Sequence, residues 1–107
     1  MNKQAEILKT LKHQLVSSFG ENIKQVILFG SQTTNEANLN SDYDILIVLK
    51  NDTDWVYNDK IYSVCYNVEL SEDVFFDINI ISENELNNSL RGKQPFILNA
   101  INKGVVA

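Results

Sequence analysis

Two short apolar runs limit the folds open to this chain more than any other feature. Residues 23–29 end in four consecutive apolar side chains, and residues 43–49 repeat the pattern. Runs of this length that are apolar at successive positions are typical of strands covered on both faces. Gly30 closes the first run, and Asp42 and Asp44 open the second. The chain is therefore expected to build layers around a sheet, with a glycine turn and two carboxylates at the strand ends.

The segments around these runs carry helical signals. Residues 8–19 place three leucines and a phenylalanine on one helical face, and Gly20 supplies a left-handed stop. A second helix is expected to begin at the capping candidates in 52–54 and to run toward Leu70, with Ile61, Cys65 and Val68 at helical spacing. Residues 31–41 are mostly small or polar, which predicts a short helical turn and a loop.

The last third of the chain continues the alternation of strands and helices. Residues 74–81 are predicted to form a third strand, and Ser82 with Glu85 gives a capping box for the helix that follows. Pro95 suits the first turn of a final helix, which Gly104 ends. Helices between strands predict an α/β or α+β layered fold.

Composition narrows the class of protein. With 107 residues, of which 44% are hydrophobic, the chain is expected to be a single domain over residues 1–107. The absence of a long apolar run and of a signal-peptide pattern predicts a cytoplasmic protein with no membrane span. Cys65 and His13 are the only residues of their types, which excludes an internal disulfide and a zinc site built on several Cys and His ligands. The net charge of −5 argues against general nucleic-acid binding.

Three acids indicate metal chemistry. Asp42 and Asp44 are two apart on a predicted strand, so both side chains can point to one side. Asp77 interrupts the apolar third strand, where burying a carboxylate is costly unless a metal or another partner compensates it. Three carboxylates on neighbouring strands could hold Mg²⁺, in one or two ions, as in sites that activate a hydroxyl and steady a pyrophosphate leaving group. Asp77 could also accept the proton of that hydroxyl.

The spacing of these residues resembles the minimal nucleotidyltransferases of the polymerase-beta-like superfamily. The chain shows Gly-Ser, ten residues and Asp-x-Asp in FGSQTTNEANLNSDYDILIVL, and a later acid in FFDINII. The resemblance implies a palm-like α+β fold, a mixed sheet of three to four strands with helices mainly on one face. It also implies that Gly30 and Ser31 hold the phosphates of a nucleotide, and that Asp42, Asp44 and Asp77 are catalytic metal ligands.

The resemblance extends to substrates and partners. It implies Mg²⁺ as cofactor and a nucleoside triphosphate, ATP or another, as donor of a nucleoside monophosphate such as AMP. The domain is small for holding both donor and acceptor, so another chain is expected to present the acceptor. Many minimal nucleotidyltransferases act as antitoxins on a small helical nuclease toxin of the HEPN type, which they modify with AMP or cover. Assembly into homo- or hetero-oligomers is compatible with this resemblance.

Two alternatives stay open at this level. Members of the family often carry arginine directly after Gly-Ser and glycine three residues further on, where this chain has Gln32 and Asn35. Losing a fork-shaped phosphate ligand weakens the case for triphosphate binding. The chain could therefore be a non-catalytic antitoxin-type module that acts by protein binding. Transfer to an aminoglycoside is a further alternative, although the chain has no evident second domain to hold the drug.

Simpler interpretations exist for individual residues. Gly30-Ser31 alone is typical of a strand-ending turn with a capping serine, and Asp42 and Asp44 alone could be a turn cap and a solvent-facing strand residue. Cys65 is expected to be a small buried hydrophobe rather than a nucleophile. Arg91 and Lys93 are assigned to a solvated loop rather than to phosphate binding. Three aromatic residues are expected to pack rather than to stack on bases: Trp55, Tyr57 and Tyr62.

Overall fold

A four-stranded mixed sheet forms the centre of the protein. The computed structural model describes residues 3–29 and 43–107. The strands are β1 (Ile23–Phe29), β2 (Tyr43–Leu49), β3 (Phe76–Ser82) and β4 (Val105–Val106), in the spatial order β3-β2-β1-β4. β1 pairs antiparallel with both β2 and β4, whereas β2 and β3 are parallel. Parallel strands need a long crossover, and α2 (Trp55–Glu72) supplies it.

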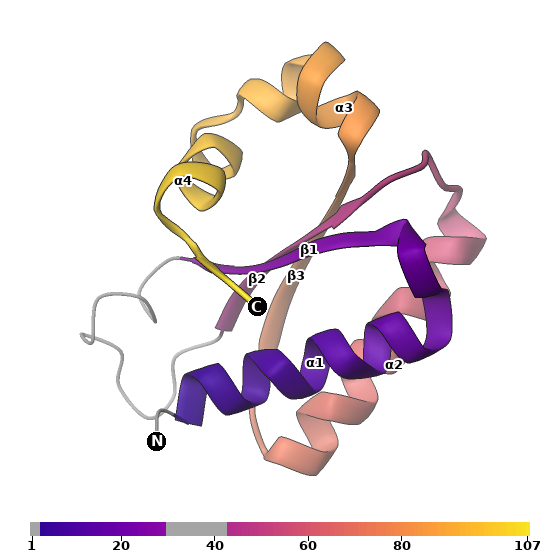
Figure 1. Cartoon of the computed structure of the whole chain (residues 1–107), viewed down its shortest axis with the longest axis vertical. Helices are drawn as coiled ribbons and strands as arrows, with labels where there is room; N and C mark the ends of the chain where they lie inside the picture. The colour runs from indigo at the N-terminus through magenta and orange to yellow at the C-terminus, as the bar shows by residue number, and fades with distance from the viewer. Residues whose placement is uncertain (1–2, 30–42) are drawn as a thin grey trace.

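Helices cover both faces of this sheet. The long helices α1 (Lys3–Phe19) and α2 lie on one face, and the shorter α3 (Glu83–Asn88) and α4 (Pro95–Lys103) lie on the other (Figure 1). Short 3-10 turns occupy Gly20–Asn22 and Leu90–Lys93. This arrangement confirms the expected α+β fold with a mixed sheet. Most of the helical residues lie on one face, as predicted, because the two long helices α1 and α2 both cover that face.

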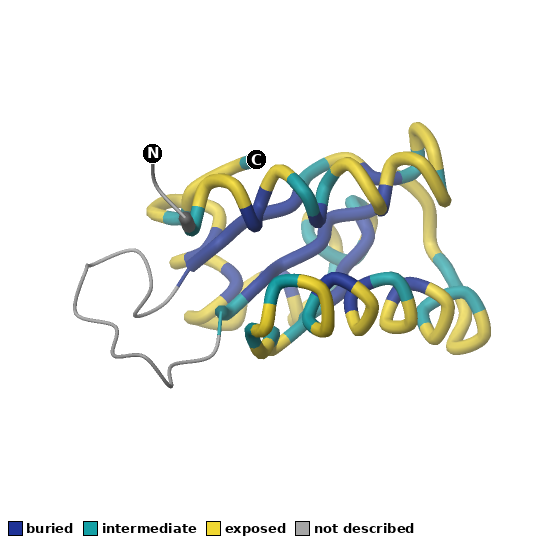
Figure 2. The backbone as a smooth tube through the Cα atoms, turned by 90° about the horizontal axis from the view of Figure 1, so that it is seen from below, coloured by how far each residue is buried: buried dark blue, intermediate teal, exposed yellow. Residues whose placement is uncertain are grey.

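Each face of the sheet has its own hydrophobic core. The face under α1 and α2 is filled by alternate strand residues together with the inward sides of both helices, including Leu11, Leu15, Ile45, Ile47 and Ile61. The face under α4 is filled by a smaller group: Ile27, Phe29, Leu46, Val48, Ile81, Ile97 and Ala100. In Figure 2 the longest buried stretches of the backbone lie in β1 and β2, while the helices keep their outer sides exposed.

Local chemistry fixes the ends of the helices largely as the sequence predicts. Gly20 has a φ of +62°, the left-handed conformation expected after α1. Asp54 caps α2 by accepting a hydrogen bond from the Tyr57 amide at 2.9 Å. Ser82 and Glu85 form the predicted capping box of α3, and the buried Ser82 hydroxyl also donates to Asp52. Each cap satisfies backbone groups that a helix end leaves unpaired.

Two sequence expectations need correction. β3 begins at Phe76 and not at residue 74, because the Val74 amide donates to the Glu69 carbonyl of α2 at 3.1 Å and the register with β2 starts at Phe76. Trp55 and Tyr62 are not packing residues, since they are 79% and 46% exposed. Tyr57 does pack, with its ring centroid 5.2 Å from that of Phe19. The predicted turn and loop over 31–41 lie outside the described residues.

Candidate functional site

Asp44 and Asp77 are direct neighbours across the parallel pair of strands. Asp44 on β2 is opposite Asp77 on β3 in the strand register. Adjacent strands are about 4.8 Å apart, and residues in register point to the same face. Leu46 and Val48 alternate with Asp44 and belong to the core under α4. The two carboxylates therefore lie on the α4 face, at the end of the sheet where β2 and β3 begin.

An aromatic pair lies beside these acids. Phe29, the last residue of β1, is opposite Asp44 in the antiparallel register, so Phe29, Asp44 and Asp77 form one row across three strands. Phe96 of α4 stacks on Phe29 with ring centroids 6.4 Å apart and planes at 30°. Sequence reasoning missed this aromatic wall. Only the strand register and the packing of α4 place these rings next to the acid pair.

A second aromatic contact lies at the same end of the sheet, on the face opposite to the acids. Tyr43 and Phe76, which precede Asp44 and Asp77, are also in register and pack edge to face at 6.1 Å. Burial raises the pKa of the Tyr43 phenol above its ordinary value. Because neighbouring residues on a strand point to opposite faces, this contact fixes the strand ends from the side away from the carboxylates.

The burial argument for Asp77 is wrong. Its side chain is exposed and Asp44 is half-buried, so neither carboxylate is enclosed in the core. Position in the sheet explains this: β3 is an edge strand, and α4 packs on β1 at the other side of this face. An exposed acid needs no compensating metal for stability. The argument for a metal therefore depends on the proximity of two carboxylates and not on a burial cost.

The described part of the site fits Mg²⁺ incompletely. Two adjacent carboxylates are oxygen ligands of the kind that Mg²⁺ prefers, and Mg²⁺ commonly uses one or two of them with substrate phosphates. Within residues 3–29 and 43–107 no group of three His, Cys, Asp or Glu side chains could hold a metal. Asp42, Gly30 and Ser31 lie outside the described residues, so their predicted roles stay predictions. By sequence, Gly30 follows Phe29 directly and Asp42 is two residues before Asp44.

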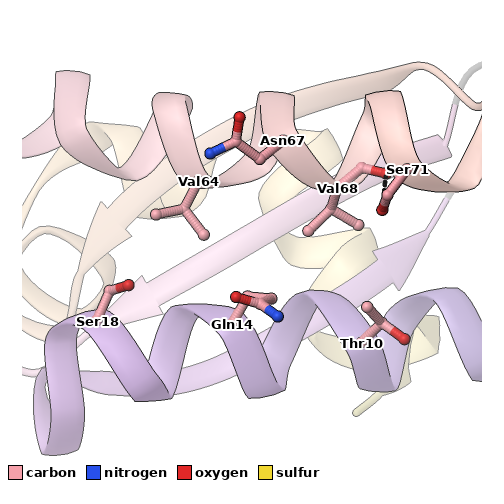
Figure 3. A pocket seen from close by; sticks show the side chains of 7 residues that line it. All are labelled: Thr10, Gln14, Ser18, Val64, Asn67, Val68 and Ser71. Atoms are coloured by element: carbon pink, nitrogen blue, oxygen red, sulfur yellow. Dashed lines mark hydrogen bonds between the residues drawn. The ribbon is translucent and has the colours of Figure 1, made fainter.

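A groove on the other side of the molecule is unrelated to these acids. It has a volume of about 320 Å³ and runs between α1 and α2 (Figure 3). Its lining contains hydroxyl, amide and apolar side chains but no acid: Thr10, Gln14, Ser18, Val64, Asn67, Val68 and Ser71. A site without a titratable side chain or a cluster of carboxylates is unsuited to metal-assisted chemistry.

The remaining candidates behave as structural residues. Cys65 is buried, and this burial, followed by the charge of Glu69, raises its pKa to about 12, so the thiol is inert near neutral pH. His13 is exposed. Arg91 is in a 3-10 turn and pairs with Glu85 at 3.2 Å, with both side chains partly in solvent.

None of the helices in the described ranges is long and apolar enough to cross a membrane.

Comparison with known proteins identifies the family. Among solved structures, a protein from Sulfolobus solfataricus described as a "putative nucleotidyltransferase" shares the fold with a TM-score of 0.59 and 23% identity, covering 94% of this chain and 76% of its own. A toxin-antitoxin structure with AMP-PNP has a TM-score of 0.57 and 16% identity, with coverages of 92% and 70%. A search of curated protein sequences gave no match. The family model described as "Polymerase beta, Nucleotidyltransferase" matches residues 6–106, and the chain belongs to this family.

Proposed function

We propose that this protein transfers a nucleoside monophosphate, in the first instance AMP from ATP, to an acceptor hydroxyl with the help of Mg²⁺. The observation that carries the proposal is the register pair of Asp44 and Asp77 at the end of the sheet where β2 and β3 begin, in a chain of the nucleotidyltransferase family. The two carboxylates share a face and reach solvent, so a metal and a polyphosphate can approach them together.

The residues have distinct roles in this proposal. Asp42, Asp44 and Asp77 hold Mg²⁺, while Gly30 and Ser31 bind the terminal phosphates of the nucleotide. Mg²⁺ held there would lower the pKa of the attacking hydroxyl and neutralise charge on the leaving pyrophosphate. Asp77 accepts the hydroxyl proton, the acceptor oxygen bonds to the α-phosphorus, and the bond from that phosphorus to the bridging oxygen breaks. The products are a nucleotidylated acceptor and pyrophosphate.

The acceptor in this proposal is a hydroxyl on a partner protein, with a helical HEPN-type toxin as the leading candidate. The described residues form one sheet and the helices that cover it, and the described groove between α1 and α2 is remote from the acids. A neighbouring fold is a toxin-antitoxin structure with AMP-PNP, which agrees with a nucleotide-using domain beside a partner chain. The protein would then act as an antitoxin by modifying its partner.

A labelling experiment tests the transfer. The full chain is incubated with α-³²P-labelled ATP, Mg²⁺ and the protein encoded by the adjacent gene, and label on protein is measured after denaturing electrophoresis. Label is expected on the partner with the wild type and is expected to be lost with Asp42→Ala and Asp44→Ala. Glu21→Gln, which removes an exposed acid outside the row, is the matched control and keeps full transfer. Equal labelling, or equal absence of label, in wild type and both Asp variants contradicts the proposal.

The non-catalytic alternative rests on a specific observation, the glutamine at position 32 where the family often has arginine. It predicts partner binding that survives removal of all three acids. Calorimetry with ATP and Mg²⁺ separates the two functions: heat of binding that disappears in Asp42→Asn supports the enzyme, and its absence in the wild type supports the binding module. Turnover in a pyrophosphate assay with aminoglycosides as acceptors would instead support the small-molecule alternative.

A further inference from the structure

Helix α2 is apolar on two separate sides. Ile61, Cys65 and Val68 are buried and face the sheet. A second set, which we call the outer stripe, consists of Trp55, Tyr62, Tyr66 and Leu70. Spacings of seven, four and four residues bring this second set onto one side of a helix, more than a quarter turn away from the buried set. One apolar side is enough to anchor a helix to a core, so the outer stripe is left without a function in the isolated fold.

The outer stripe is well exposed. Trp55 is 79% exposed, Tyr62 46%, Tyr66 58% and Leu70 65%. Single apolar residues on a surface are ordinary, but several large ones aligned along one helix commonly mark an interaction site. Tryptophan and tyrosine are enriched among the residues that contribute most to protein binding, because they bury a large area with few rotatable bonds. The composition of the stripe therefore points to a protein partner.

Acidic residues accompany the outer stripe. Asp59 and Glu69 lie three, four or seven residues from its members, which places them beside it on the helix surface, and Asp73 follows the last residue of the helix, three after Leu70. Both ion pairs formed between described residues, Lys24 with Glu83 and Arg91 with Glu85, involve other elements. Lys60 is the only base of α2 and falls on a different side of the helix, five residues after Trp55 and two before Tyr62. The stripe is thus an apolar surface with an acidic border that forms no ion pair with another described residue.

We propose that the outer stripe of α2 docks a partner protein through an apolar helix flanked by lysine or arginine. Charge complementarity carries the choice of occupant, since basic residues would meet Asp59, Glu69 and Asp73 at the border while apolar side chains cover the aromatic centre. A second copy of this chain is a poor occupant in a two-fold contact, which apposes the same acidic patches in a protein of net charge −5. This inference goes beyond the proposed transfer and requires none of its three acids.

A fluorescence titration tests the docking surface. Trp55 is the only tryptophan of the chain, so its emission reports binding of a peptide that contains none. The probe is a synthetic amphipathic helix of leucine, alanine and lysine, and the control peptide has glutamate in place of lysine. The lysine peptide is expected to shift the Trp55 emission to shorter wavelength and to bind at least about tenfold more tightly than the glutamate peptide.

Variants decide whether binding is on the stripe. Tyr66→Ala and Leu70→Ala are each expected to weaken the lysine peptide at least about tenfold. Leu90→Ala is the matched control, because Leu90 is 84% exposed but lies outside α2, and it is expected to leave affinity unchanged. Circular dichroism checks folding, and Asp44→Asn with Asp77→Asn separates this surface from the proposed catalytic acids, since both variants should bind as the wild type does.

Three results would overturn the inference. The first is equal affinity of the two peptides, which removes the role of the acidic border. The second is binding that Tyr66→Ala and Leu70→Ala do not weaken, which moves the contact elsewhere. The third is a concentration-dependent dimer in sedimentation that Leu70→Ala converts to monomer, which would make a second copy the occupant. None of these measurements uses ATP or Mg²⁺, so they fail or succeed independently of the proposed transfer.

Discussion

The two faces of the central sheet differ in a way that separates stability from chemistry. Under α1 and α2 the strands are apolar along their length, and Ile45, Ile47 and Leu49 are fully covered. Under α4, β2 and β3 begin with Asp44 and Asp77 and become apolar only further along, at Leu46 on β2 and at Ile81 on β3. Alternation along each strand makes this possible, because a face can carry acids at one end without disturbing the core on the other.

The difference teaches that Asp77 is not required for the fold. Asp77 is exposed at an edge strand, so its charge remains hydrated and its removal leaves no buried polar group unpaired. The core side chains of the α1 and α2 face, in contrast, are held among neighbours on all sides. Substitutions on the two faces should therefore affect different measurements, and the following predictions are ordered by the size of the expected effect.

The largest effect is expected on activity, when an acid on the α4 face is replaced. Asp77→Asn should lower nucleotidyl transfer roughly a thousandfold, because it removes a proposed metal ligand and proton acceptor. Its free energy of unfolding should change by no more than about 0.5 kcal/mol, as is usual for exposed positions. Rates of pyrophosphate release and urea titrations of the same preparations measure the two quantities. Full activity in this variant would contradict the assignment of the chemistry to the acids on the α4 face.

Substitutions on the face under α1 and α2 should lower stability and leave activity unchanged. Ile47 is fully buried on the central strand β2, so Ile47→Ala should destabilise the protein by about 2–5 kcal/mol through lost apolar contacts and a residual cavity. Transfer measured well below the melting temperature should stay close to the wild-type rate, because Ile47 points away from the acids. A urea midpoint equal to that of the wild type would mean that this face does not carry the stability.

A smaller loss is expected where α4 joins the sheet. A side chain at Gly104 would collide with the Ala100 carbonyl and with Ile27, which belongs to the core of this face. Gly104→Ala should therefore cost about 1–3 kcal/mol, since the neighbours must shift to admit a methyl group. Asn102→Ala, an exposed change on the same helix, is the control and should be nearly neutral. Equal thermal midpoints for the two variants would contradict the tight contact.

Much of the fold could be predicted because local chemistry decides it. The apolar runs gave the bounds of β1 and β2, and the capping residues gave the starts of α2 and α3. The end of α2 had no such signal, because Asp73 takes a left-handed conformation at φ +56° that glycine or asparagine adopts more readily. Trp55 and Tyr62 are exposed and not packed as expected, because the sequence shows that a side chain is apolar and not whether another element covers it.

The site could be predicted only in part, because it depends on pairing between distant strands. Sequence spacing brought out Asp44 and Asp77 as candidates, but their direct opposition follows from the parallel register that the α2 crossover sets. The exposure of Asp77 follows from the position of β3 at the edge of the sheet. Phe29 and Phe96 come from strands and helices far apart in the chain, so no local pattern linked them.

The smallest predicted effect concerns Cys65 of α2, in the core under α1 and α2, and depends on pH. Burial raises its pKa from 9.0 to about 12, so the folded protein keeps this proton more tightly than the unfolded chain does. The stability that the neutral thiol contributes is complete below about pH 9 and is lost as the pH rises from about 9 toward 12. Between pH 8 and pH 10 the free energy of unfolding from urea titrations should therefore fall about 1.4 kcal/mol further in the wild type than in Cys65→Ala, which keeps every other ionisable side chain. Parallel curves for the two proteins would mean that the thiol reaches water, and the α1 and α2 face would then be less tightly closed than its packing indicates.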